Sequence, residues 1–133
     1  MQGALVEENN AIVQMLLDKG ADVDVQGGKY GNALQAASFV GNDAILQMLL
    51  DKGADVNAQG GEYGNALQAA SYQGNDTIVQ MLLDKEADVN AQGGEHGNAL
   101  QAASYRMNHA TVQILLDKGA VMVQCLSSDS GNQ

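Results

Sequence analysis

Proline and tryptophan are absent from this 133-residue sequence, which also contains only one phenylalanine and one cysteine. Because aromatic side chains are so few, Ala, Leu, Val and Met must supply most of any buried core. The single thiol, Cys125, has no partner for an internal disulfide, which favours a reducing compartment. We also identify no base paired with Cys125 in the sequence, so a catalytic thiol is not expected.

Basic residues are scarce as well, since six Lys and Arg face sixteen Asp and Glu for a net charge of -10. Proteins that bind nucleic acid need clustered positive charge, so nucleic acid and anionic membrane surfaces are not expected partners. No apolar run approaches the roughly 20 residues that span a bilayer, and the N-terminus lacks the basic start of a secretory signal. We therefore expect a soluble, cytoplasmic chain or a piece of a larger one.

Patterns that carry chemistry are missing too. The two histidines, His96 and His109, lie in different segments from Cys125, and a zinc site usually needs four convergent ligands. The acidic residues recur periodically, which is typical of a solvated face rather than of an asymmetric carboxylate pair. Gly-Gly occurs three times without the lysine and serine of a phosphate-binding loop. The sequence predicts no enzyme, no cofactor and no metal.

The dominant feature is an internal repeat. The string Gly-Asn-Ala-Leu-Gln-Ala-Ala-Ser starts at Gly31, Gly64 and Gly97, so that successive copies are 33 residues apart. The repeat predicts one domain over residues 1–125 and a polar tail over 126–133. Its units are a partial first unit, 1–26, followed by 27–59, 60–92 and 93–125. Stacked units bury the apolar faces that one unit cannot bury alone, and about three are needed.

The sequence of each unit predicts a turn followed by two helices. In residues 60–92, Asn65 is a helix cap, and Gln68 stands where it could reach back to complete a capping box. A first helix is expected over residues 66–72 and a second over about 76–85, with apolar side chains on one side. Small alanines in the first helix let neighbouring helices approach closely.

Two places depart from the repeat. Glu86 stands where the preceding unit has Gly53, a position suited to a left-handed residue after a helix. If that geometry is kept, Glu86 costs about 1 kcal/mol. At the start of the chain, residues 1–6 form a poor first helix, because Gly3 replaces an alanine, and we expect them to fray.

These units resemble ankyrin repeats over residues 1–125. The resemblance lies in Gly53-Ala54-Asp55-Val56-Asn57 and in the four Leu-Leu-Asp-Lys helices, whereas Asn65-Ala66-Leu67-Gln68 replaces the usual Thr-Pro-Leu-His. It implies an all-α solenoid of about four helix-turn-helix units joined by short hairpin-like turns. The variant Tyr-Gly-Asn-Ala-Leu-Gln-Ala-Ala-Ser is similar to arrays in fungal multidomain proteins that carry a nucleotide-binding regulatory module, although no such module is visible.

The resemblance also implies a function, which is non-catalytic binding of a partner protein through the concave face. This face consists of the turn tips and the exposed side of each first helix. The matching positions are Lys29, Glu62 and Glu95 at the tips, with Phe39, Tyr72, Tyr105, Val40, Gln73 and Arg106 on the first helices. Side chains vary here while the scaffold strings repeat, which suits a recognition surface.

Alternatives remain at several positions. Phe39, Tyr72 and Tyr105 could instead be packing contacts between first helices. Tyr30, Tyr63 and His96 form a second column near the turns, for which we favour a structural role. Asn57 and Asn90 match an asparagine that is hydroxylated in some ankyrin proteins, but a turn asparagine bonded to its own backbone is favoured.

The whole array also has an alternative function. It could be a spacer or a self-associating segment of a larger protein. Weak self-association would use the C-terminal end, where Val121-Met122-Val123 leaves an apolar edge.

Overall fold

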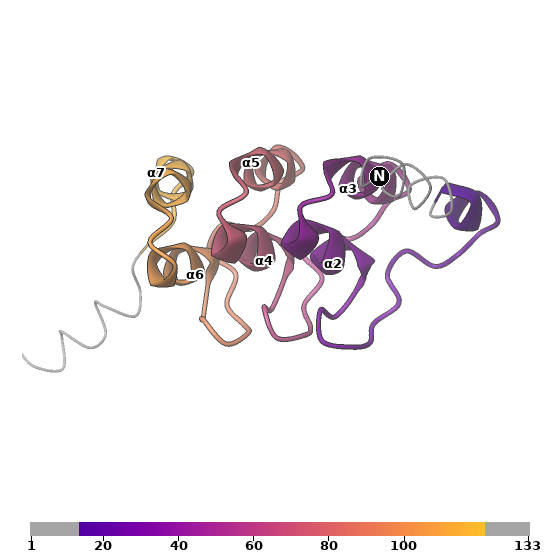
Figure 1. Cartoon of the computed structure of the whole chain (residues 1–133), viewed down its shortest axis with the longest axis horizontal. Helices are drawn as coiled ribbons and strands as arrows, with labels where there is room; N and C mark the ends of the chain where they lie inside the picture. The colour runs from indigo at the N-terminus through magenta and orange to yellow at the C-terminus, as the bar shows by residue number, and fades with distance from the viewer. Residues whose placement is uncertain (1–13, 122–133) are drawn as a thin grey trace, which may run out of the picture.

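Two layers of short helices stack side by side along the chain (Figure 1). The computed structural model describes residues 14–121. Its helices are α2 (Ala33–Val40), α3 (Asp43–Asp51), α4 (Ala66–Gln73), α5 (Asp76–Asp84), α6 (Ala99–Tyr105) and α7 (His109–Asp117). Residues 14–18 are helical as well.

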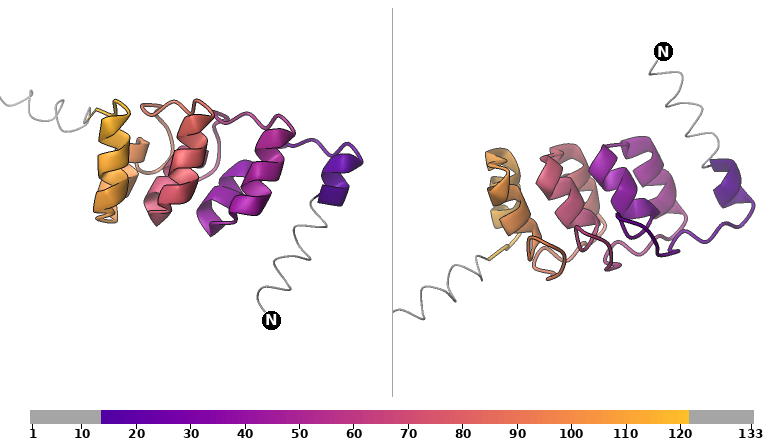
Figure 2. Two further views of the ribbon diagram at one scale, coloured as in Figure 1. Left: turned by 90° about the horizontal axis from the view of Figure 1, so that it is seen from above. Right: turned by 60° about the horizontal axis from the view of Figure 1, so that its bottom comes forward.

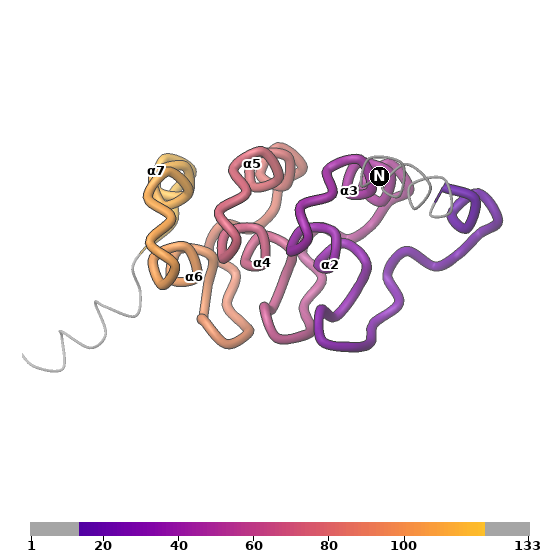
Figure 3. The backbone as a smooth tube through the Cα atoms, viewed as in Figure 1, coloured from indigo at the N-terminus to yellow at the C-terminus, as the bar shows by residue number. Residues whose placement is uncertain are grey.

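The first helices of the units form one layer and the second helices form the other. Figure 1 shows α2, α4 and α6 in one row, with α3, α5, α7 and the helical residues 14–18 in the row above. Each first helix packs against the second helix of its own unit, and α4 packs against both α2 and α6. Seen from above in Figure 2, the units follow one another along the long axis. The backbone trace in Figure 3 shows the loops between units projecting below the first-helix row.

The predicted helix cap is confirmed, but the predicted capping box is only half formed. Asn65 Oδ1 accepts a hydrogen bond from the backbone N–H of Gln68 at 2.8 Å, and Asn32 and Asn98 cap their helices in the same way. The Gln68 side chain does not reach back to the cap. Its Nε2 instead donates to the carbonyl oxygen of Ala91 at 3.5 Å, which ties the first helix to the loop that leads into the next unit.

The backbone at Glu86 is left-handed, so the geometry on which its expected cost depends is kept. Its φ is 70°, and Gly53 one unit earlier has a φ of 87°. Both residues follow the last turn of a second helix, where the chain must reverse. Glu86 therefore carries the conformational strain that glycine avoids at this position.

The core consists mainly of alanine and aliphatic side chains, as the composition predicted. Leu34, Leu67 and Leu100 occupy equivalent positions in the three first helices and are at most 2% exposed. The second helices contribute Leu46, Leu49, Ile78, Val79, Leu82 and Leu115. Alanine side chains between the first helices allow these helices to lie close together, and one continuous cluster extends through the stack.

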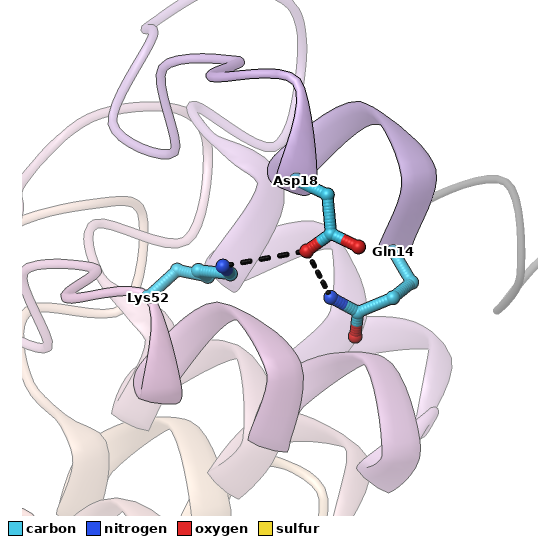
Figure 4. Close-up of polar contacts among 3 residues, drawn as sticks. All are labelled: Gln14, Asp18 and Lys52. Carbon is cyan, nitrogen blue, oxygen red and sulfur yellow. Dashed lines mark hydrogen bonds and ion pairs between the residues drawn. The ribbon is translucent and has the colours of Figure 1, made fainter.

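The described part of the first unit is a short helix that lies beside α3. Leu17 is 8% exposed within the core cluster. Asp18 Oδ1 accepts from Gln14 Nε2 at 2.8 Å and lies 3.4 Å from Lys52 Nζ in the next unit (Figure 4). This ion pair is about half exposed, so it contributes little to stability. The predictions for residues 1–6, for Met122 and Val123, for Cys125 and for the tail 126–133 lie outside the described residues.

Candidate protein-binding surface

The turn tips form a row held together by the main chain. The N–H of Glu62 donates to the carbonyl oxygen of Lys29 at 2.9 Å, and the N–H of Glu95 donates to the carbonyl oxygen of Glu62 at 2.9 Å. All three side chains are exposed. The backbone thus sets the spacing of the tips, while the side chain at each tip is free to differ between units.

The two predicted aromatic columns form one interleaved stack, which we call the aromatic ladder. It runs in the order Tyr30, Phe39, Tyr63, Tyr72, His96 and Tyr105, and the successive ring centroids are 5.1, 4.9, 5.2, 5.0 and 4.9 Å apart. Rings from the turns therefore alternate with rings from the first helices. These separations lie within the range of favourable aromatic contacts. Each successive contact joins a ring from a turn to a ring from a first helix, and the ladder crosses the two boundaries between the units that contain α2, α4 and α6.

Burial along the ladder is uneven. Tyr63, in the middle, is 7% exposed, whereas Tyr105 at the end is 69% exposed. Burial raises the pKa of the Tyr63 phenol above its ordinary value, and the nearby carboxylate of Glu62 adds to the rise. Tyr63 packs as part of the scaffold, while Tyr105 offers an aromatic surface to the solvent.

The column of Val40, Gln73 and Arg106 is only partly available to a partner. Gln73 Nε2 donates to the carbonyl oxygen of Phe39 at 3.1 Å, and the Arg106 guanidinium lies 4.7 Å from the centre of the Tyr72 ring. Both side chains reach back to the preceding first helix. Val40 differs, since it is 71% exposed.

Asn57 and Asn90 do not bond their own backbone, so that favoured interpretation is wrong. Asn57 Oδ1 accepts from the N–H of Asp88 at 2.7 Å, and its Nδ2 donates to the carbonyl oxygen of Glu86 at 3.4 Å. Asn90 makes the equivalent pair of bonds to Val121 and Gly119. These side-chain amides join successive loops. The sequence shows that the asparagine recurs, but the partners lie one unit further along the chain.

Sequence reasoning also missed Asn108. Its Nδ2 donates to the carbonyl oxygens of Ser71 and Tyr72, both at 2.9 Å. These carbonyl groups lie in the last turn of α4, and that of Ser71 also accepts from the backbone N–H of Gly74 at 3.2 Å. Asn108 makes no side-chain cap for its own helix, α7. The only available signal was that Asn42, Asn75 and Asn108 recur at one position of the repeat.

Metal-binding side chains are not clustered on the described part of the surface. Within residues 14–121, no three His, Cys, Asp or Glu side chains are grouped so that they could hold a metal ion. His96 is a rung of the aromatic ladder, and its Nε2 lies 4.0 Å from Glu95 Oε1.

Helix pairs stacked in a row, with variable side chains on a regular scaffold, define a repeat solenoid. A family model described as ankyrin repeats (3 copies) matches residues 1–60 and 34–129. The chain therefore belongs to the ankyrin-repeat family, whose repeats are generally protein–protein interaction modules. A search of curated proteins found no match. None of the described helices is long and apolar enough to cross a membrane.

Proposed function

We propose that this chain is a non-catalytic module that binds a partner protein through its turn tips and the exposed side of its first helices. The main-chain bonds between the tips carry this proposal. They hold Lys29, Glu62 and Glu95 in a row, so a partner meets three side chains of fixed spacing. A preorganised surface loses little conformational entropy when it binds.

The local environments divide the predicted contact residues into two groups. Lys29, Val40, Glu62, Glu95 and Tyr105 are exposed and form the first group, although the Tyr105 ring also stacks on Tyr72 with the centroids 6.3 Å apart. Phe39, Tyr72, Gln73 and Arg106 also contact neighbouring units, and they form the second group. Replacing the second group would disturb the scaffold together with any binding, so the first group provides the cleaner test.

The test is affinity capture from lysate with quantitative mass spectrometry. The recognition variant carries Glu62→Ala, Glu95→Ala and Tyr105→Ala. The matched control carries Gln47→Ala, Gln80→Ala and Gln113→Ala, which are exposed at equivalent positions on the second-helix layer. Circular dichroism checks that both variants fold.

We expect at least one protein to be captured by the wild type and by the control but reduced severalfold with the recognition variant. Tyr105 supplies the main loss, because aromatic side chains dominate interface energetics. Equal capture by all three chains, or capture of nothing, would contradict binding through this surface.

Self-association through the C-terminal end is the alternative, and exposed apolar residues favour it. Met107, Leu116 and Val121 are 69%, 43% and 46% exposed. Met107, however, stands where the other units have glycine, and a side chain there obstructs a further unit in the same geometry. Light scattering over a range of concentrations separates the two functions. A molecular mass that stays at that of the monomer at every concentration would exclude self-association.

Two broader predictions accompany this function. A cytoplasmic location is proposed from the single cysteine, and cell fractionation tests it. An origin within a fungal multidomain protein with a nucleotide-binding regulatory module is proposed from the variant repeat string alone. The coding sequence on either side of this segment tests that origin.

A further inference from the structure

Two neighbouring turn tips carry carboxylates that have no lysine or arginine partner among the described residues. Glu62 and Glu95 are both exposed, and the main-chain bond between the two tips holds them side by side. Within residues 14–121, neither carboxylate forms an ion pair with a lysine or an arginine, and Glu95 lies only beside the His96 ring. Because like charges held close together repel each other, this part of the surface favours a positively charged ligand.

The Tyr63 hydroxyl adds another unpartnered oxygen near these tips. Tyr63 is 7% exposed, and its ring is held in the ladder between Phe39 and Tyr72. Among the described residues, its hydroxyl has no hydrogen-bond partner, and the oxygen is not fully enclosed. Burial raises the pKa of this phenol, and Glu62 and Glu95 both add to the rise, so the hydroxyl lies within electrostatic reach of both carboxylates. It can accept a hydrogen bond from a ligand without breaking one within the protein.

Two cations of this chain lie on the same face, but aromatic rings hold them. The Arg106 guanidinium lies 4.7 Å from the centre of the Tyr72 ring, and Lys29 Nζ lies 5.6 Å from the centre of the Tyr30 ring. Both distances are within the range of cation–π contacts. These contacts leave the carboxylates of Glu62 and Glu95 available to a cation from outside the chain.

The acceptors on this face suit a guanidinium better than an ammonium group. Two carboxylates and a phenol oxygen are separate acceptors, and arginine presents five N–H donors in a rigid planar group. Lysine, in contrast, is a compact and strongly hydrated point charge. Hydrogen bonds between a guanidinium and a carboxylate are among the stronger ones in proteins. The net charge of -10 also attracts a basic partner.

We propose that Glu62, Glu95 and the Tyr63 hydroxyl bind an arginine side chain of the partner protein. The guanidinium donates to the two carboxylates and to the phenol oxygen. This inference rests on the proposed function, because it identifies the chemistry that the partner presents to the same turn tips.

The probe is a fluorescent peptide of alternating glycine and arginine, GRGRGRG, titrated with the whole chain and followed by fluorescence anisotropy. The salt concentration is about 50 mM, so that exposed charges are only weakly screened. We expect saturable binding with a Kd below about 1 mM. The matched lysine peptide, GKGKGKG, should bind at least about threefold more weakly, because an ammonium group lacks the planar set of donors.

Variants of the chain locate the site. Glu62→Gln with Glu95→Gln removes both charges at constant side-chain size and should weaken binding of the arginine peptide at least about fivefold. Tyr63→Phe keeps the ring in the ladder, removes the hydroxyl and should weaken binding at least about twofold. The matched control is Asp51→Asn with Asp84→Asn, which makes the same change of net charge at exposed residues of the second-helix layer. It should bind within about twofold of the wild type. Thermal unfolding checks that every variant folds.

Four results would overturn the inference. They are no saturable binding of the arginine peptide, equal binding of the arginine and lysine peptides, equal losses in the two double variants, and full binding by Tyr63→Phe. Equal losses in the double variants would show that the peptide responds only to net charge.

The proposed function is judged separately, by the capture from lysate in which Tyr105 supplies the main loss. Capture of a protein that the recognition variant loses, together with no binding of the arginine peptide, would leave the proposed function in place and refute only the arginine site.

Discussion

Two sets of left-handed residues end the helices of this protein, and they differ in what surrounds them. After the first helices stand Gly41, Gly74 and Met107, with φ values of 88°, 71° and 60°. After the second helices stand Gly53, Glu86 and Gly119, with φ values of 87°, 70° and 99°. Each set contains one residue that is not glycine.

The two sets face different surroundings. A Cβ added at Gly74 would lie 2.8 Å from Cγ of Asn108, and one at Gly41 would lie 3.0 Å from Nδ2 of Asn75. Around Gly53 and Gly119, nothing lies within 4 Å of the added atom. After a first helix, glycine is thus needed both because φ is positive and because the next unit leaves no space for a side chain. After a second helix, only the positive φ favours glycine.

This difference explains where the exceptions fall. Glu86 lies in the middle of the array, where a side chain meets only solvent and the cost is conformational. Met107 lies in the last described unit, and no asparagine of a following unit is among the described residues. The joint between units, more than the individual turn, therefore constrains the sequence after the first helices.

The largest effect is expected for Gly74→Ala. The substitution adds left-handed strain and displaces the Asn108 side chain, which forms two hydrogen bonds to α4. We expect a loss of about 2–4 kcal/mol in the free energy of unfolding, measured by urea denaturation. A loss below that of Gly53→Ala would contradict the steric part of the comparison.

Removing the asparagine tests the same joint from its other side. Asn108→Ala leaves the carbonyl groups of Ser71 and Tyr72 without their amide partner and should cost about 1–2 kcal/mol. The control is Gln113→Ala, an exposed change on the same helix, for which we expect almost no effect on the urea midpoint. Similar losses in the two variants would show that the Asn108 bonds contribute nothing.

Gly53→Ala should have a smaller effect, because only the backbone conformation is strained. We expect a loss of about 0.5–1 kcal/mol, since restriction of the unfolded chain by alanine offsets part of the strain. Thermal unfolding followed by circular dichroism measures it. A loss of stability as large as that of Gly74→Ala would show that the free space around Gly53 does not reduce the cost of adding a side chain.

The smallest expected effect has the opposite sign. Glu86→Gly relieves the strain at φ 70° and should raise the free energy of unfolding by about 0.5–1 kcal/mol. Glu86→Ala keeps the strain and is the matched control. A melting temperature that is unchanged or lowered in the glycine variant would argue against strain at this residue.

Much of the fold could be predicted from the sequence, because the 33-residue period places every helix and turn in an equivalent position. The helix caps and the left-handed Glu86 follow from local rules, which apply within a few residues. The prediction that the Gln68 side chain bonds back to the Asn65 cap was wrong, because this side chain bonds instead to the carbonyl group of Ala91, 23 residues away. Rules that consider only neighbouring residues cannot predict so distant a hydrogen-bond partner.

The candidate surface was harder to predict for the same reason. Sequence reasoning found both aromatic columns but treated them separately, because their interleaving depends on how far each turn folds over its helix. It assigned Asn57 and Asn90 to local turns, whereas their partners lie 29 and 31 residues away. The contacts missed are those that cross between units, which the repeat period implies but does not identify.

The most direct test of the joint is a double-mutant cycle with Gly74→Ala and Asn108→Ala. If glycine is needed to make room for the asparagine, the double variant loses less stability than the two single variants together. The shortfall should be at least about 1 kcal/mol in urea denaturation. Losses that add within about 0.3 kcal/mol would show that Gly74 and Asn108 act independently, and would contradict the conclusion that the joint between units constrains both residues.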